Sequence, residues 1–506
     1  MIAKIHSAIP YGFEGRLIEV EGDMNRGLPA FNIVGMANKT VSESKERVRS
    51  AIVNSEFCFP DKKVTISLAP AGLPKDGAYL DLPIALSVLV LSGQLLQSDV
   101  RDKLFIGELS LNGEIRPVKG IINIIEAAKE AGYHEAYVPE KNLAQATLIA
   151  NQDIAIYGVE TLESLYLALK GQCGLNMAHT ALIGQKKPLE RTKGPFLDYI
   201  RGQELAKRAM TIAIAGHHNI LISGPPGAGK TLLAKAAANL LPDLTPTEMI
   251  DLTKLYSIAG LSTDEIVVER PFRAPHHTAS PISIIGGGPG AGPGEVSLAH
   301  RGILFLDEIP EFPRAVLEAL RQPLEDKSIT ISRANHKAMY PADLMLIATM
   351  NPCPCGYLGD PTHECNCTEI QIQNYQRKLS GPLFDRIDLN VTVDRVDNED
   401  LRRTPSGKST EHNVVKNTIT EAIRRQRERF ERDGIYNSSL SSFQVSQMLK
   451  MDSSAEALLA QASEKLSLSA RAYFKTIKVA RTIADLDGTD LILAKHLAEA
   501  LTFRRR

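Results

Sequence analysis

The hydrophobic and polar positions divide the chain into regions with different periodicities. In residues 1–170, strand-like apolar runs (64–68, 105–111 and 136–138) alternate with helical patterns (42–54, 82–91 and 121–131). This alternation predicts an α/β or α+β domain over residues 1–170. The periodicity is lost in residues 171–193, where Gly, Gln, Lys and Pro gather, and we place an interdomain linker there.

Residues 194–400 show apolar strands that alternate with helices. Strand patterns at 219–223, 302–306 and 343–348 are joined by segments that include a helical pattern at 231–239. Because these strands are nearly continuous apolar runs, they predict a parallel sheet that is covered on both faces. Residues 401–506 predict a separate helical lid, since they carry only helical patterns, at 411–430, 441–450, 455–466, 470–485 and 491–501.

The composition narrows the cellular setting. A chain of 506 residues exceeds one hydrophobic core, and its 43% hydrophobic and 23% charged residues are ordinary for a soluble globular protein. No apolar run approaches the roughly 18 residues of a membrane span, so we expect a cytoplasmic protein with no membrane partner. The net charge of −1 excludes a globally basic surface. Any affinity for nucleic acid must come from local patches, and a ring-shaped oligomer can repeat one such patch around its channel.

One segment has the pattern of a phosphate-binding loop. It fits G-x-x-x-x-G-K-[ST] with Gly224, Pro225, Pro226, Gly227, Ala228, Gly229, Lys230 and Thr231. We expect the backbone N–H groups to wrap the phosphates of ATP, with Lys230 at the β and γ phosphates and the Thr231 hydroxyl on Mg²⁺. The alternative is a chance glycine-rich turn, which the preceding strand and the following helix disfavour.

A second strand ends in two acids. The apolar run at 302–306 is followed by Asp307 and Glu308, and open α/β sheets bind ligands at the carboxyl ends of their strands. We expect Asp307 to hold the Mg²⁺ shell and Glu308 to polarise the attacking water. Adjacent acids at a strand end are otherwise often only solvated, and the phosphate-binding loop favours the catalytic interpretation.

These features together resemble the AAA+ superfamily. In its pattern a further strand ends in an asparagine, here Asn351, whose amide would bridge the γ-phosphate and the attacking water, although Asn is also a frequent turn residue. The segment 381–388 resembles the one that carries an arginine finger, so Arg386 would reach a neighbour's ATP, and Arg471 resembles the sensor-2 residue at the γ-phosphate. Either arginine could instead be an ordinary surface or ion-pairing residue. An arginine supplied in trans implies a homo-oligomer, which in this superfamily is usually a hexamer.

Further segments carry a closer resemblance. Residues 271–278, 286–294, 350–356 and 479–485 look like those of the magnesium-chelatase-like YifB/ComM family, and the resemblance covers essentially the whole chain. It implies a ring-shaped, ATP-dependent DNA helicase that acts on single-stranded and branched DNA and promotes branch migration during DNA uptake and recombination in natural transformation. The alternative is a motor that remodels a partner protein, as in magnesium chelatase.

Two inserts could contact DNA. Residues 328–340 predict a β-hairpin where related helicases have a pore hairpin, and Arg333, His336 and Lys337 would then meet phosphates. The Gly- and Pro-rich insert at 269–300 carries Arg273 as a further candidate.

The cysteine positions favour a metal site. Four of the six cysteines form two Cys-x-Cys pairs that nine residues separate, namely Cys353, Cys355, Cys365 and Cys367. Four thiolates from two loop ends suffice for a tetrahedral Zn²⁺ site, and we expect structural zinc there. Free or redox-active cysteines are the alternative, whereas Cys58 and Cys173 look like ordinary thiols.

The amino-terminal domain resembles the Lon-protease-like domain. The resemblance is strongest in Pro74-Lys-Asp-Gly77-Ala-Tyr79 and continues at 107–113 and 117–120. In Lon-type proteases, a nucleophilic Ser and an activating Lys occupy two positions that here hold Tyr79 and Ile122. Because these residues cannot form a Ser–Lys dyad, we expect no proteolysis and favour a role in assembly or DNA binding, with Lys75 as a candidate surface residue.

Overall fold

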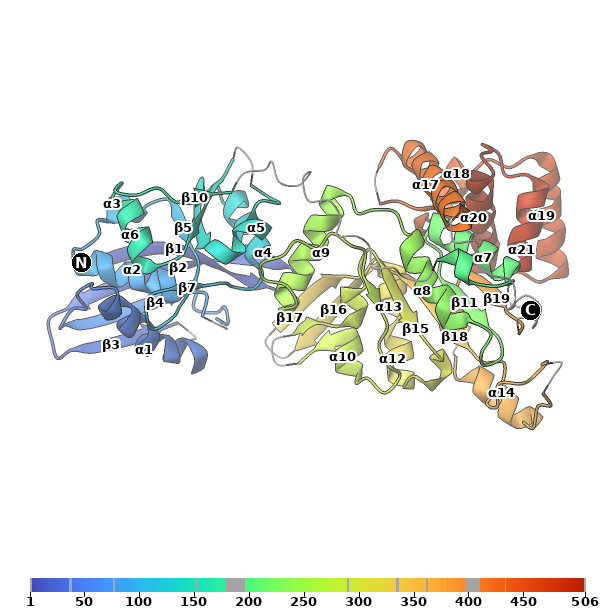
Figure 1. Ribbon diagram of the computed structural model, residues 1–506, viewed down its shortest axis with the longest axis horizontal. Helices are drawn as coiled ribbons and strands as arrows, with labels where there is room; N and C mark the ends of the chain where they lie inside the picture. Colours follow the sequence, from blue (N-terminus) through green and yellow to red (C-terminus); the bar gives the residue numbers. More distant parts are fainter. Residues whose placement is uncertain are drawn as a thin grey trace.

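The computed structural model describes residues 2–35, 39–75, 78–150, 153–178, 196–288, 291–333, 336–360, 363–379, 381–395, 410–432 and 434–504. They form an amino-terminal α/β unit, a central unit on a parallel sheet and a helical carboxyl-terminal unit, arranged along an elongated molecule (Figure 1). None of the helices in these ranges combines the length and the hydropathy that a membrane span requires.

The amino-terminal unit is built on a mixed sheet with the strand order β10-β9-β8-β5-β1-β2-β4-β3. Helix α2 is buried along its whole length, and α2 and α4 pack against β1 and β2. The strands are β1 (Ile2–Tyr11), β2 (Glu14–Asn25), β3 (Ala30–Val34), β4 (Lys63–Ala69), β5 (Lys103–Phe105), β8 (Glu135–Pro139), β9 (Ala155–Val159) and β10 (Asn176–Met177), with a small hairpin of β6 (Glu108–Leu109) and β7 (Ile115–Arg116). The helices are α1 (Lys39–Asn54), α2 (Asp81–Leu91), α3 (Gln97–Val100), α4 (Ile121–Glu130), α5 (Leu143–Ala146) and α6 (Leu162–Leu169).

The centre of this sheet is the antiparallel hairpin β1–β2, which the periodicity analysis did not predict. Ala3, Ile5 and Ser7 are buried and alternate with more exposed residues. Small and polar residues at the buried positions weaken the hydrophobic signal of this strand. The predicted strand at 105–111 is wrong in part, because β5 ends at Phe105 and β6 covers only Glu108–Leu109.

The central unit confirms the predicted parallel sheet. Its strand order is β12-β15-β18-β11-β19, and every neighbouring pair is parallel. Ile220 and Ile222 face helices α7 and α8, whereas Leu221 faces the opposite side with residues of α12, so both faces are covered. The strands are β11 (Ile220–Ser223), β12 (Phe272–Arg273), β15 (Ile303–Leu306), β18 (Met345–Met350) and β19 (Leu389–Thr392). The helices include α7 (Glu204–Gly216), α8 (Lys230–Leu240), α9 (Pro246–Ala259), α12 (Arg314–Ala319), α13 (Arg321–Asp326), α14 (Glu369–Arg377) and α15 (Gly381–Phe384).

The inserts of the central unit contain two antiparallel hairpins. β16 (Ser328–Arg333) pairs with β17 (His336–Pro341), which confirms the hairpin predicted at 328–340, and its tip lies outside the described residues. The Gly- and Pro-rich insert folds into α10 (Pro281–Ile285), β13 (Gly286–Gly287), β14 (Gly292–Pro293) and α11 (Glu295–Leu298). Ile331 of β16 and Tyr340 of β17 are buried in one cluster with Leu255 of α9, so the hairpin is anchored to the central unit.

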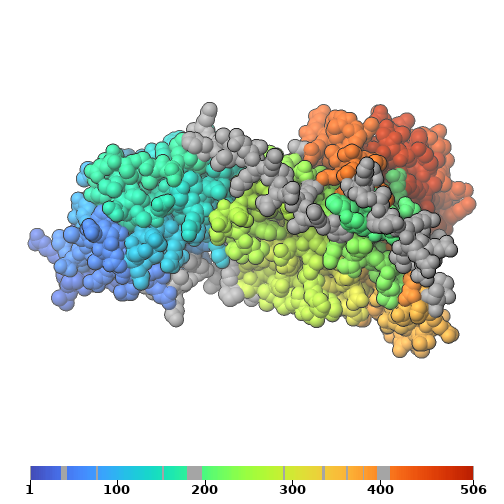
Figure 2. All heavy atoms as spheres, in the orientation of Figure 1, coloured from blue at the N-terminus to red at the C-terminus, as the bar shows by residue number. Residues whose placement is uncertain are grey.

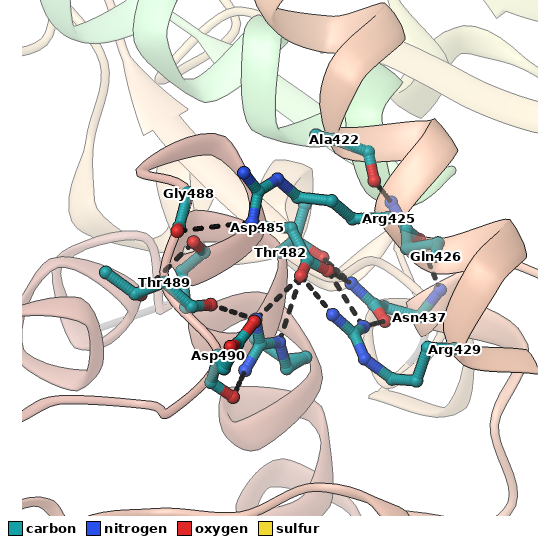
Figure 3. A network of polar contacts seen from close by, with 12 residues as sticks. Ala422, Arg425, Gln426, Arg429, Asn437, Thr482, Asp485, Gly488, Thr489 and Asp490 are labelled. Carbon is teal, nitrogen blue, oxygen red and sulfur yellow. Dashed lines mark hydrogen bonds and ion pairs between the residues drawn. The ribbon is translucent and has the colours of Figure 1, made fainter.

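The carboxyl-terminal unit is helical, with α17 (Thr410–Phe430), α18 (Ser442–Met448), α19 (Ser453–Lys465), α20 (Ala470–Leu486) and α21 (Ala494–Thr502). A buried polar network holds it together (Figure 3). The Asp485 carboxylate accepts hydrogen bonds from Arg429 (Nη1, 3.0 Å), Asn437 (2.8 Å) and Arg481 (Nη2, 2.7 Å). Because a buried carboxylate is costly unless it is paired, this network fixes α17 and α20 relative to each other.

His218 extends this network to the parallel sheet. It is fully buried, and its ring nitrogens lie 2.9 Å from Thr482 Oγ1 of α20 and 3.1 Å from Asp388 Oδ2, just before β19. The helical unit is therefore joined to the end of the sheet where β11 and β19 begin.

The amino-terminal unit contacts the central unit through α4 and α9. Lys254 of α9 pairs with Glu126 of α4 and lies 4.4 Å from the ring centre of Phe13, and Ser257 accepts a hydrogen bond from the Gly120 backbone at 2.9 Å. The predicted linker is too long at its amino-terminal end, since β10 pairs with β9. The rest of that linker, residues 179–193, and the predicted boundary between 400 and 401 lie outside the described residues.

In the amino-terminal unit, Lys75 corrects an expectation. It was a candidate surface residue, but it is 1% exposed, and its ammonium group donates hydrogen bonds to the carbonyl oxygens of Leu68 (3.0 Å) and Pro70. Burial lowers the pKa of Lys75. Ile122 is fully buried in the core, and Asp76 and Gly77 lie outside the described residues.

Candidate nucleotide-binding site

The glycine-rich turn between β11 and α8 has the backbone that a phosphate-binding loop needs. Gly227 and Gly229 have φ of +79° and +83°, in the left-handed region that favours glycine. At Gly224 a Cβ would lie 2.3 Å from the carbonyl oxygen of Val393, so no side chain fits there. The turn presents successive N–H groups at the start of a helix, where anions bind.

Lys230 is held at the centre of this loop. Its Nζ donates hydrogen bonds to the carbonyl oxygens of Gly224 (2.5 Å) and Pro225 (2.9 Å) and to Asn351 Oδ1 (2.9 Å). Burial lowers the pKa of Lys230, and the negative charges of Asp307 and Glu308 oppose this shift. These contacts bring Lys230 and Asn351, from segments 121 residues apart, to one place.

The two acids meet the loop at the carboxyl end of β15. All four residues of β15 are buried, and the Thr231 hydroxyl lies 3.1 Å from Asp307 Oδ2. Two oxygen ligands at this separation suit Mg²⁺, which prefers hard oxygen donors and keeps several waters. Glu308 is exposed beside them and has φ +51°, a strained conformation for a residue other than glycine.

Thr349 supports both acids. Its hydroxyl donates to Asp307 Oδ1 and accepts a hydrogen bond from the Glu308 N–H at 3.0 Å. It stands two residues before Asn351 at the end of β18, a position that the sequence analysis passed over. The carboxyl ends of β11, β15 and β18 thus converge on one cluster of groups suited to phosphate and Mg²⁺.

Arg386 and Arg471 lie at the amino edge of the same sheet, meaning the end where its strands begin, opposite the end that holds the phosphate-binding loop. Both line a cavity of about 700 Å³ with Asn219, Leu344 and Asp388, which precede β11, β18 and β19. The four residues of β11 separate this cavity from the phosphate-binding loop by about 13 Å at 3.3 Å per residue. Neither arginine belongs to the cluster around Lys230.

Glu325 of α13 binds both arginines. Its carboxylate pairs with Arg386 and lies 3.6 Å from Arg471 Nη2. Arg386 also donates to the carbonyl oxygens of Arg321 (3.0 Å) and Pro382 (2.7 Å). The two guanidinium groups are therefore held side by side by one acid.

The four cysteines of the loop after β18 converge on one point. Cys353 Sγ lies 3.3 Å from Cys355 Sγ and 3.6 Å from Cys365 Sγ, and all four sulfur atoms lie within 4.8 Å of one another. Cys353 is buried, and the other three are partly buried. Cys58 and Cys173 are exposed and stand apart from this cluster.

The candidate DNA contacts have different settings. Lys337 is exposed on β17, whereas the side chains of Arg333 and His336 lie outside the described residues. Arg273 forms a two-pronged ion pair with Glu295 at 2.6 Å for both contacts, and this pairing raises its pKa. A charge that Glu295 neutralises is better suited to holding the insert together than to binding a phosphate.

Comparison with known proteins gives full-length relatives. The chain is 42% identical to competence protein ComM of Haemophilus influenzae over 99% of this chain and 97% of that protein. The chain belongs to the magnesium-chelatase-like YifB/ComM family of AAA+ proteins. It is also 39% identical to the YifB protein of Escherichia coli over 99% of this chain and 96% of that protein.

Three family models match this chain, one for each of its three units. Residues 20–142 match subunit ChlI of Mg-chelatase, residues 196–401 match magnesium chelatase subunit ChlI, and residues 409–504 match its C-terminal model. The magnesium-chelatase 67 kDa subunit of Chlorobaculum parvum is 24% identical over 161 residues, which is 31% of this chain and 23% of that protein. Family membership implies ATP and Mg²⁺ as ligands, and the cluster around Lys230 and Asp307 has the donor groups for both.

Two residues of this YifB/ComM chain that sequence reasoning missed are Thr349 and Glu325. The position of Thr349, two residues before Asn351, was a usable signal, since polar residues at neighbouring strand ends come together. Glu325 carried no signal, because its partners are 61 and 146 residues away in the chain.

Proposed function

We propose that the protein is a Mg²⁺-dependent ATPase that works as a homo-oligomeric ring, a hexamer, and drives DNA through its channel. The observation that carries the ATPase is the convergence of Lys230, Asp307 and Asn351 at the carboxyl ends of three parallel strands. Lys230 would bind the β and γ phosphates, and Thr231 and Asp307 would hold Mg²⁺. Glu308 would accept a proton from the attacking water, while Asn351 orients that water.

The ring follows from the two arginines. Arg386 and Arg471 lie at the sheet edge opposite the phosphate-binding loop, so they can reach a phosphate only on another copy of the chain. A contact in which one edge of a copy meets the opposite edge of the next is heterologous, and it generates a ring when its rotation closes. There Arg386 would stabilise the charge that develops on the transferred phosphoryl group.

The DNA-translocating role rests on the β16–β17 hairpin and on the relatives. The hairpin projects Lys337 into solvent from an anchored base, and six copies of one modest patch would form a basic ring. The name of the Haemophilus influenzae relative, competence protein ComM, supports a role in competence. We therefore propose branch migration on single-stranded or branched DNA during DNA uptake and recombination, in the cytoplasm.

A strand-displacement assay tests this function. A labelled strand in a four-way or three-way DNA junction is incubated with the protein, ATP and Mg²⁺, with the Glu308→Gln protein as the matched control. We expect ATP-dependent displacement that the control lacks. Lys337→Ala should reduce displacement while ATP hydrolysis without DNA is unchanged, because Lys337 lies outside the nucleotide cluster.

A motor that remodels a partner protein is the second candidate. Met339 of β17 is 62% exposed next to Lys337, so the hairpin presents an apolar as well as a charged side chain. ATP hydrolysis that is intact but never displaces a strand would favour this candidate over the DNA motor. If the unmodified protein does not hydrolyse ATP, both candidate functions are contradicted.

A further inference from the structure

We infer that Cys353, Cys355, Cys365 and Cys367 bind one Zn²⁺ ion, and that this ion positions the phosphate-binding loop. The second half of this inference rests on the proposed nucleotide site, and the first half does not. The zinc site would be a structural one, with four protein ligands and no open position for a substrate.

The distances between the sulfur atoms fit zinc and exclude disulfides. Three of the separations are 3.3 Å for Cys353–Cys355 and 3.6 Å for Cys353–Cys365 and Cys355–Cys365. A disulfide needs about 2.05 Å between its sulfur atoms. A tetrahedral ion with Zn–S bonds of about 2.3 Å places its ligands about 3.8 Å apart, close to the observed spacing.

The donor set selects the metal. Four thiolates in a tetrahedral arrangement suit Zn²⁺ or an iron–sulfur centre, and the hard ions Mg²⁺ and Ca²⁺ avoid them. The ligands close in a compact loop, with the Cys355 N–H directed at Cys367 Sγ at 3.4 Å. Four sulfur atoms within 4.8 Å of one another leave room for a single ion rather than for a cluster with bridging sulfides.

The loop needs such a crosslink. Its described residues between Asn351 and Thr368 contain no helix or strand, so backbone hydrogen bonds hold it only weakly. Figure 2 shows that the α14 segment, which follows the last cysteine, projects from the body of the protein. Gln376 of α14 returns to the loop and donates a hydrogen bond to the Pro352 carbonyl oxygen at 3.3 Å.

The same loop touches the phosphate-binding loop directly. Gly356 follows the first cysteine pair with φ +88°, and a Cβ there would lie 2.8 Å from Pro226 Cδ. On the other side of the first pair, Asn351 stands two residues before Cys353 and accepts the Lys230 hydrogen bond. An ion that fixes Cys353 and Cys355 thus fixes both contacts to the nucleotide site.

The test uses the full-length protein and three measurements. These are metal content by mass spectrometry of the protein as purified, affinity for a fluorescent ATP analogue, and far-ultraviolet circular dichroism as a check of folding. We expect one zinc per chain, and release of that zinc by a chelator should weaken nucleotide affinity about tenfold, as disturbed supporting contacts of binding sites do. Added Zn²⁺ should restore it.

Matched variants separate the two halves of the inference. Cys353→Ser and Cys365→Ser should lose zinc, while Cys58→Ser and Cys173→Ser, at exposed thiols away from the loop, should keep it. Gly356→Ala should retain zinc but weaken nucleotide binding. Gly359→Ala is its control, since Gly359 has a similar φ of +82° and nothing within 4 Å of its Cβ position.

Each outcome bears on one half. Less than about half a zinc per chain, or iron in its place, overturns the zinc site. Zinc release with unchanged nucleotide affinity in a folded protein, or equal effects of Gly356→Ala and Gly359→Ala, overturns the positioning role. Untreated protein that holds zinc but binds no ATP analogue contradicts the proposed ATPase and the positioning role, and leaves the zinc site standing.

Discussion

The central sheet has a carboxyl edge, where its strands end, and an amino edge, where they begin. These two edges differ in how complete their functional groups are within one chain. At the carboxyl edge, the loop after β11, the acids after β15 and the polar end of β18 already touch one another through Lys230, Asp307 and Thr349. At the amino edge, Arg386 and Arg471 face a cavity and share the one negative charge of Glu325. In the proposed ring, one chain would therefore carry two halves of a reaction site that face in opposite directions.

The largest expected effects come from the carboxyl edge. Lys230→Ala should abolish ATP binding and, with it, assembly, because the phosphates lose their buried cation. Glu308→Gln should bind ATP, assemble and fail to hydrolyse it, because only the proton acceptor is lost. Equilibrium binding of a labelled nucleotide, size-exclusion chromatography and phosphate release separate these outcomes. Equal loss of ATP binding in both variants would contradict this division of roles.

Arg386→Ala tests whether the amino edge completes the site of a neighbour. ATP hydrolysis should fall about 10³-fold, the scale of arginine fingers, with nucleotide binding retained. Mixing Arg386→Ala with Glu308→Gln should restore part of the activity, since about one interface in four then joins an intact glutamate to an intact arginine. A mixture as inactive as its components would show that Arg386 acts within its own chain or only stabilises the fold.

Glu325→Gln should sharpen the contrast by releasing both arginines. A partly exposed ion pair contributes about 0.2–1 kcal/mol, so we expect basal ATP hydrolysis to rise by a factor of about 1.4 to 5. The control is Glu318→Gln, which removes a nearby pair with Arg321 and should leave the rate unchanged. If Glu325→Gln lowers the rate, the carboxylate orients the arginines for reaction rather than competing with the phosphate.

The last expected effect concerns stability at low pH. His300, at the amino edge, is 3% exposed, its Nδ1 accepts a hydrogen bond from the Asp343 N–H at 3.0 Å, and burial lowers its pKa to about 3. The unfolded chain takes up this proton below about pH 6.5 and the folded chain does not, so stability is full above that pH and falls as the pH drops toward 3. The loss should reach about 2 kcal/mol at pH 5.

Thermal unfolding between about pH 7.5 and pH 5 measures this effect. His300→Gln should be less stable at the higher pH and show a flatter pH dependence, whereas the exposed His134→Gln should follow the unmodified protein. A His300→Gln protein with the full pH dependence would assign that dependence to other groups.

How much could be predicted from the sequence differs between the same two edges. The motifs around Lys230 and Asp307 are local. Glycines identify the phosphate-binding loop, and a buried apolar strand leads to the acids. The arginines could be read only by resemblance, because their position depends on contacts such as Arg386–Glu325 that join distant segments. The β1–β2 hairpin was missed because its buried positions include alanine and serine, and Lys75 because a buried amine can be satisfied by two carbonyl oxygens.

One contact gives the β16–β17 hairpin a mechanical setting. Gly12, in the turn between β1 and β2, has φ +60°, and a Cβ there would lie 3.1 Å from the Cβ of Ala338 in β17. The turn between β1 and β2 therefore packs directly against β17 of the hairpin. If the hairpin moved toward the amino-terminal unit, it would have to displace that whole folded unit. Movement of the hairpin away from the amino-terminal unit would not meet this obstacle.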